Sequence, residues 1–73
     1  MLFNEFVIGN TYKLSKDIFI DKYHNGYSLY PKWHLIVLIS KNEDNKQLFV
    51  KSLQPIEDIE ATKHFYVIAD ELI

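Results

Sequence analysis

Three histidines, at positions 24, 34 and 64, are the side chains of this 73-residue chain best suited to bind a metal or transfer a proton. A zinc site needs three or four convergent nitrogen, oxygen or sulfur ligands, and the chain has no cysteine. His34 and His64 could lie on neighbouring strands, with His24 at a hairpin tip that folds over them. The absence of an H-x-x-x-H spacing favours three unrelated surface or edge histidines. We therefore predict no metal site and no cofactor.

The common catalytic motifs are missing from the sequence. It has no cysteine nucleophile and no G-x-S-x-G, and its two glycines are too few for a phosphate-binding loop. A histidine–acid pair such as His64 with Asp70 is the arrangement that stays open. A domain of this length also offers little room for a buried pocket. We therefore predict that the protein is not an enzyme.

Aromatic residues are concentrated between positions 12 and 33, which hold six of the eleven in the chain (five Phe, five Tyr and one Trp). Tyrosine and tryptophan provide a large contact area and a polar group, which suits protein interfaces. The same rings could instead fill the core of a small β domain. We expect a division in which Trp33 and Phe19 lie inside. Tyr27 and Tyr30, beside a hairpin tip and a proline, are expected to be exposed.

Narrower interpretations use the same rings. The cluster could form an aromatic cage for a cation. It could also stack the bases of a single-stranded nucleic acid, with Lys22 and Lys32 beside the rings, or form a self-interface in an oligomer. We expect a protein partner. The predicted partner-binding residues are Tyr23, His24, Tyr27, Tyr30, Lys32, Glu57, Asp58 and Glu60.

Charge divides the chain into two parts. Residues 1–41 carry five lysines against three acids, a balance of +2, and residues 42–73 carry three lysines against seven acids, a balance of −4. All eight basic residues are lysine, whereas readers of DNA sequence rely on the bidentate contacts of arginine. An acidic chain without arginine matches a basic protein surface better than it matches nucleic acid. The acidic run at 57–60, with Asp70 and Glu71, could imitate nucleic acid or could be a solvated helical turn and tail.

The apolar pattern predicts a series of short strands. Residues 33–40 form the strongest one, and their apolar side chains on both faces indicate a central strand. A polar turn at 41–45 then predicts a hairpin with the strand that follows. The expected strands lie at residues 11–15, 18–24, 27–30, 33–40, 46–53 and 64–68.

The Asn-Gly pair at residues 25–26 is the strongest turn signal, because both central positions of a type I′ turn need positive φ. With a two-residue loop, Lys22 faces Leu29 and the hairpin pairs 18–24 with 27–30. The proline that follows cannot donate a ladder hydrogen bond and should end the hairpin.

Pro55 and the acids after it predict one short helical turn near residues 55–61, because proline suits the first helical position and acids stabilise a helix N-terminus. The length predicts a single domain over residues 1–73. The expected fold class is mainly β, a strongly bent antiparallel sheet or barrel of five to six strands with that one helical turn.

Location and origin can also be inferred from composition. The start of the chain does not resemble a signal peptide, and the longest apolar run, residues 35–39, is far below the ~20 residues of a membrane helix. We expect a cytoplasmic location. Abundant Lys, Asn, Ile, Phe and Tyr indicate an AT-rich genome, such as that of a phage or a low-GC bacterium. A phage protein would act in the host cytoplasm.

The segments IGNTYKL, WHLIVLIS…NKQLFVKSL and HFYVIADELI together resemble the SH3-like small barrels of phage and low-GC bacterial proteins. The resemblance covers most of the chain from Ile8 onward, and the long excursion before Trp33 sits where such a barrel carries its first long loop. It implies the SH3-like fold and the habit of binding a partner, and it implies no chemistry. The ALYDY-like stretch, tandem Trp pair and Pro-Tyr of the eukaryotic peptide-binding members are missing, so the resemblance does not extend to polyproline binding.

These observations predict a non-catalytic protein-binding module. We expect a phage or mobile-element accessory protein that binds a host or defence protein and sterically inhibits or redirects it. One alternative is a nucleic-acid-binding or transcription accessory module, and another is a structural phage component that acts as an oligomer.

Overall fold

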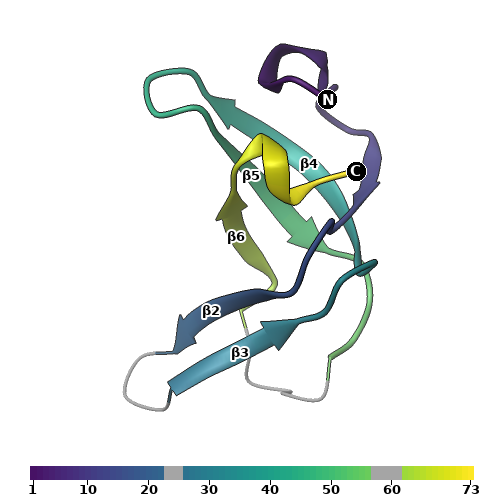
Figure 1. The fold of residues 1–73 in the computed structure, drawn as a ribbon, viewed down its shortest axis with the longest axis vertical. Helices are drawn as coiled ribbons and strands as arrows, with labels where there is room; N and C mark the ends of the chain where they lie inside the picture. Colours follow the sequence, from purple (N-terminus) through teal and green to yellow (C-terminus); the bar gives the residue numbers. More distant parts are fainter. Residues whose placement is uncertain (23–25, 57–61) are drawn as a thin grey trace.

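Strands dominate residues 1–22, 26–56 and 62–73, the part of the chain that the computed structural model describes (Figure 1). Two 3-10 turns, η1 (Phe3–Glu5) and η2 (Ala69–Glu71), lie near the ends of the chain. The strands are β1 (Thr11–Lys13), β2 (Ile18–Lys22), β3 (Gly26–Tyr30), β4 (Leu35–Asn42), β5 (Gln47–Ser52) and β6 (His64–Val67). One antiparallel sheet has the order β1-β4-β5-β6, and the other is the β2–β3 hairpin. The predicted mainly β class with five to six strands is confirmed for the described residues.

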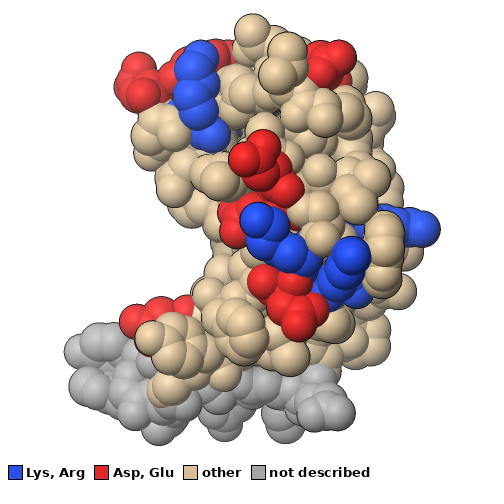
Figure 2. All heavy atoms as spheres, in the orientation of Figure 1, with Lys and Arg blue, Asp and Glu red and all other residues tan. Residues whose placement is uncertain are grey.

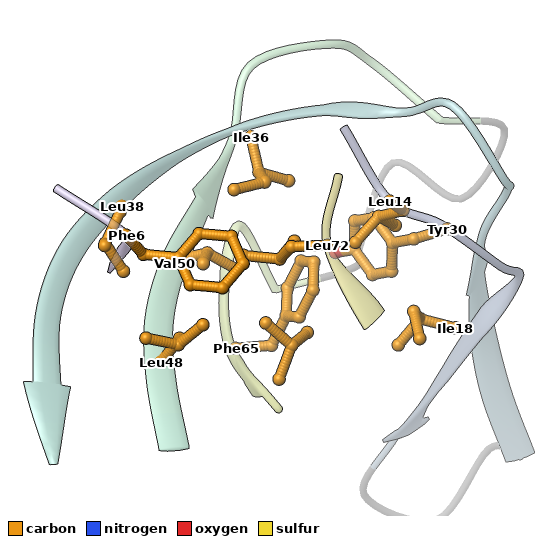
Figure 3. Close-up of a cluster of buried hydrophobic side chains, with 11 residues drawn as sticks. Phe6, Leu14, Ile18, Tyr30, Ile36, Leu38, Leu48, Val50, Phe65 and Leu72 are labelled. Atoms are coloured by element: carbon orange, nitrogen blue, oxygen red, sulfur yellow. The ribbon is translucent and has the colours of Figure 1, made fainter. Parts of the chain in front are cut away.

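The four-stranded sheet packs one face against the core. Its strands alternate buried and more exposed residues, as expected for a sheet with one covered face. The pairing of β4 with β5 shifts between Leu38 and Ser40, which leaves Ile39 as an additional residue in β4. A bulge of this kind bends a strand, and Figure 3 shows β4 arching over the core. The buried residues of this face are Ile36, Leu38, Leu48, Val50, Phe65 and Val67.

The end of the chain returns to β1. Leu14 and Leu72 form an isolated antiparallel bridge, and both side chains are buried. Around them the amide of Lys13 donates to the carbonyl of Ile73 (3.1 Å) and the amide of Ile73 donates to the carbonyl of Lys13 (2.8 Å). The predicted barrel is not found in the described residues, because the strands divide between two separate sheets.

The core combines aliphatic side chains with three aromatic rings. Tyr30 is 1% exposed, and its ring centroid lies 4.4 Å from that of Phe65. Its hydroxyl donates to the carbonyl of Thr62, so the polar end of the ring has a hydrogen-bond partner at the edge of the core. The expectation that Tyr30 is exposed is therefore wrong. Figure 3 shows the cluster, which comprises Phe6, Leu14, Ile18, Tyr30, Ile36, Leu38, Leu48, Val50, Phe65, Val67 and Leu72.

The register predicted for the β2–β3 hairpin is wrong. Lys22 pairs with Gly26, and Phe19 pairs with Leu29. Three residues, 23–25, therefore separate the strands, and they lie outside the described part of the chain. Because side chains alternate between the two faces of a strand, a loop that is one residue longer than predicted turns each residue of β2 to the opposite face relative to β3. Gly26 does adopt the positive φ, 85°, that the Asn-Gly signal predicts.

Trp33 lies in a turn between β3 and β4 and is not part of the core. Its side chain is 56% exposed and that of Phe19 is 62% exposed, so the expectation that both lie inside is wrong. The amide of His34 donates to the carbonyl of Pro31 (3.1 Å), and Trp33 has a φ of 75°. This value fits the third position of a type II turn. The turn takes Trp33 out of the alternation of β4, which begins at Leu35 and turns Ile36 towards the core.

Helical structure in the described residues is short. η1 and η2 span three residues each. Of the helical turn predicted near 55–61, Pro55 and Ile56 belong to neither helix nor strand, and 57–61 lie outside the described residues. No helix in the described ranges is long and apolar enough to cross a membrane.

Candidate partner-binding groove

A groove of about 550 Å³ runs beside β3. It brings together residues of β3, of the turn that follows it and of the segment after β5, which are far apart in the sequence. Its volume is within the range of pockets that hold small ligands or a few side chains of a partner. The lining residues are Tyr27, Ser28, Leu29, Pro31, His34, Pro55 and Ile56.

The pattern of β3 explains the apolar rim of the groove. Tyr27 and Leu29 point to the outer face of the hairpin and are 68% and 44% exposed, whereas Ser28 points inward and is buried. Tyr27 and Leu29 from one face and Ser28 from the other all line the groove. Because the two faces meet at the edge of a strand, the groove runs along the edge of β3. Pro31 ends the strand because it has no amide hydrogen for the ladder. The groove therefore has a rim of rings and aliphatic groups.

His34 forms the polar floor. It is 5% exposed, and Nε2 lies 2.6 Å from Oγ of Ser52. Oγ of Ser52 also donates to the carbonyl of Gln54 (2.9 Å). Because the hydroxyl has one proton, His34 Nε2–H is the donor to Ser52, and Nδ1 is the ring nitrogen that remains as an acceptor. Desolvation by burial lowers the pKa of His34 from 6.5, which favours this neutral form.

The direction of these hydrogen bonds determines what the pair can do. A nucleophilic serine needs a histidine that accepts its proton, whereas His34 donates to Ser52 and the serine proton is directed at Gln54. The arrangement therefore suits binding and orientation. Among the described residues, no three His, Asp or Glu side chains are grouped so as to hold a metal. His24, which the sequence placed in a possible metal set, lies outside them.

The outer face of the β2–β3 hairpin extends the apolar surface of the groove. Phe19 stands opposite Leu29, and Asp21 stands opposite Tyr27. All four are exposed, so three of the four side chains on this face offer apolar area to solvent. Figure 1 shows the hairpin projecting from the four-stranded sheet, and Figure 2 shows lysines and acids interspersed over the molecule's middle. Exposed apolar area beside a groove is typical of an interaction site.

The residues predicted from the sequence have different outcomes. Tyr27 lines the groove, whereas Tyr30 belongs to the core. Lys32 is exposed beside the groove, with Nζ 4.9 Å from the centroid of the Trp33 ring and its amide donating to Oδ1 of Asp17 (2.7 Å). The other five predicted residues lie outside the described part of the chain, namely Tyr23, His24, Glu57, Asp58 and Glu60.

Sequence reasoning missed most of the lining. Leu29, Pro31, Pro55 and Ile56 meet only because the segment after β5 packs beside β3. The two prolines were a usable signal, since each ends or follows a strand and neither can extend a ladder. The role of His34 depends on Ser52, eighteen residues away, and no local pattern predicts that contact.

Comparison with known proteins identifies no family. No family model matches the chain. No significant match is found among curated proteins or among solved structures.

Proposed function

We propose that this protein is a non-catalytic binding module that holds an apolar segment of a protein partner in the groove beside β3. The observation that carries the proposal is the apolar rim, in which Tyr27 and Leu29 are exposed and Pro31 and Pro55 line the same groove. Burying such side chains contributes about 1.5–3 kcal/mol each. Prolines and rings lose little conformational freedom when a partner binds, which favours their use as anchors.

The floor of the groove supports this proposal by offering a polar group. Nδ1 of His34 would accept an N–H from the partner, because Nε2 is engaged by Ser52. A small number of polar groups among apolar ones fixes the orientation of a ligand. The same contact would discriminate between partners, since an unpaired buried nitrogen lowers affinity.

An SH3-like fold is part of the proposal. It is supported by the sheet order β1-β4-β5-β6, with the β2–β3 hairpin inserted between β1 and β4. It is also supported by the end of the chain, where η2 precedes the bridge between Leu72 and Leu14.

We further propose that the setting is a phage or mobile element and that binding inhibits or redirects a host or defence protein by steric occlusion. The support is compositional: a short chain with no cysteine, no arginine and many residues of the types that AT-rich codons encode. The net charge of −2, with −4 in residues 42–73, would favour a partner with a basic surface.

The test is capture of proteins from a low-GC bacterial lysate by the immobilised chain. The variant Tyr27→Ala/Leu29→Ala removes the rim, and both side chains are exposed enough for the fold to persist. The matched control is Tyr66→Leu, a substitution of an exposed tyrosine that is outside the groove. A partner of this groove is retained by the wild type and the control, and its affinity for the rim variant falls by about 30-fold.

If every captured protein binds the rim variant as well as the wild type, the groove is not the binding site and the proposal fails. Light scattering over a dilution series measures whether the chain forms an oligomer. An oligomer that dissociates when the rim is removed would make the groove a self-interface instead of a site for a foreign partner.

A further inference from the structure

The outer face of the four-stranded sheet carries a second group of rings, separate from the groove, of which two are exposed and Phe49 is half-buried. Strand pairing places Phe49 opposite Tyr66 and Lys51 opposite His64. The ring centroid of Phe49 lies 4.8 Å from that of Tyr66 and 5.6 Å from that of His64, and the latter pair is within 15° of parallel. Tyr66 is 52% exposed and His64 is exposed. We call Phe49, His64 and Tyr66 the ring platform.

The charged residues of the four strands are all lysines, although the chain is acidic. Lys51 lies between Val37 and His64 in one row across the sheet, and Lys13, opposite Leu35, points to the same face. Both lysines are exposed. The four strands of this sheet contain no acidic residue. The acids of the described chain lie outside these four strands, at Glu5, Asp17, Asp21, Glu43, Asp44, Asp70 and Glu71.

We propose that the ring platform, with Lys51 and Lys13, binds single-stranded nucleic acid. Unpaired bases stack on exposed aromatic rings, and lysines neutralise the phosphates between them. Stacked rings beside two lysines, with no acid in the same four strands, match the bases and phosphates of a single-stranded nucleic acid. A duplex hides the faces of its bases, so it would use the lysines and leave the rings without a partner.

The composition of the surface determines how such binding behaves. With two lysines, the slope of log K against log salt is about −1.4, since each neutralised phosphate of a single strand contributes about −0.7. Without arginine, the surface has no bidentate group for reading bases. Binding is therefore weak, salt-dependent and tolerant of sequence.

The experiment measures the fluorescence anisotropy of a labelled oligodeoxythymidine of about ten nucleotides, titrated with the full chain at several salt concentrations. Tyr66→Leu keeps an apolar side chain but removes a stacking surface, and it is expected to weaken binding about tenfold. Lys51→Gln is expected to halve the salt slope, to about −0.7. Far-UV circular dichroism establishes that each variant is folded.

Two control variants lie outside the platform. Tyr27→Leu changes an exposed tyrosine of the groove. Lys46→Gln changes an exposed lysine in the β4–β5 turn, whose Nζ lies 3.4 Å from Oε2 of Glu43. Both are expected to bind the oligonucleotide as the wild type does. Because the groove and the platform share no lining residue, this result does not depend on the fate of the protein-binding proposal.

Several results would overturn the proposal. One is the absence of binding at low salt, and another is equal binding by wild type and a folded Tyr66→Leu variant. Equal affinity for a duplex of the same sequence would reduce the surface to phosphate attraction. Equal affinity for polyglutamate would make it a site for acidic proteins instead.

Discussion

The backbone amide of Trp33 donates to the carbonyl of Leu14 across 2.8 Å, and this bond holds an exposed tryptophan at a φ of 75°. A bulky residue rarely adopts this conformation, which places its Cβ close to the backbone. Such an outlier stores about 1–3 kcal/mol of strain. The surrounding hydrogen bonds maintain this conformation in a turn of which two residues, Pro31 and His34, line the groove.

Replacing Trp33 tests this strain. Trp33→Gly removes the Cβ and relieves the conformation, whereas Trp33→Ala removes the ring but retains the Cβ. We expect the glycine variant to be more stable than the alanine variant by about 1 kcal/mol in urea denaturation followed by far-UV circular dichroism. An alanine variant as stable as the glycine variant would show that the turn is not strained.

Tyr30 connects the hairpin to the segment before β6 through its hydroxyl. We expect Tyr30→Phe to lower the free energy of unfolding by about 1–2 kcal/mol, because the carbonyl of Thr62 loses its donor. Tyr30→Ala should lower it by about 3–5 kcal/mol through loss of core packing. Tyr27→Ala is the control, since its side chain is 68% exposed and its removal should change stability by less than about 0.5 kcal/mol. Equal effects of Tyr27→Ala and Tyr30→Ala in thermal or urea unfolding would contradict the assigned core.

His34 makes stability depend on pH. Burial lowers its pKa in the folded state below the 6.5 of the unfolded chain, so below neutrality the unfolded chain binds more protons. The contribution of His34 is therefore complete above pH 6.5 and is lost progressively as the pH falls through 6.5 towards the folded pKa. We expect the wild type to lose more stability than His34→Gln between about pH 7.5 and 5.5, measured by urea midpoints. Parallel profiles for the two proteins would mean that His34 does not titrate in this window.

Leu72 brings the end of the chain back to β1. It is 4% exposed and forms a bridge with Leu14, so Leu72→Ala is expected to lower the free energy of unfolding by about 2–5 kcal/mol. Ile73→Ala is the matched control, because that side chain is 53% exposed while its backbone bonds to Lys13 remain. Hydrogen exchange of the Ile73 amide should accelerate in the Leu72 variant alone. Unchanged protection would indicate that the bridge does not depend on core packing.

The strands themselves could be predicted, because each has a local apolar pattern. The hairpin of β4 with β5 follows from two apolar runs around a polar turn, and the structure has it. The positive φ of Gly26 also follows from residue type alone. The faces of the strands could not be assigned in the same way. In β4, apolar residues occupy both faces, and only packing selects Ile36 and Leu38 as the buried pair.

The candidate sites depended even more on tertiary contacts. Tyr27 was identified because it follows a turn signal, but Tyr30, three residues later, faces the core. Segments that are distant in sequence meet at the apolar rim of the groove, in the contact of His34 with Ser52, and in the stacking of Phe49 with His64. No periodicity encodes such contacts, since they arise when sheets and connections pack.

The sequence by itself determined the β class, the short strands, the hairpin of β4 with β5 and the absence of cysteine and arginine, because these depend on residue type and local pattern. The tertiary structure alone decided which rings are buried. A three-residue loop in place of a two-residue one reversed the face of Phe19, and one turn with a positive φ placed Trp33 in solvent. The two outcomes have different physical causes, because the turn takes Trp33 out of the strand, whereas the face of Phe19 follows from strand pairing. The side-chain period of a strand is two, so a change of one residue in loop length exchanges core and surface.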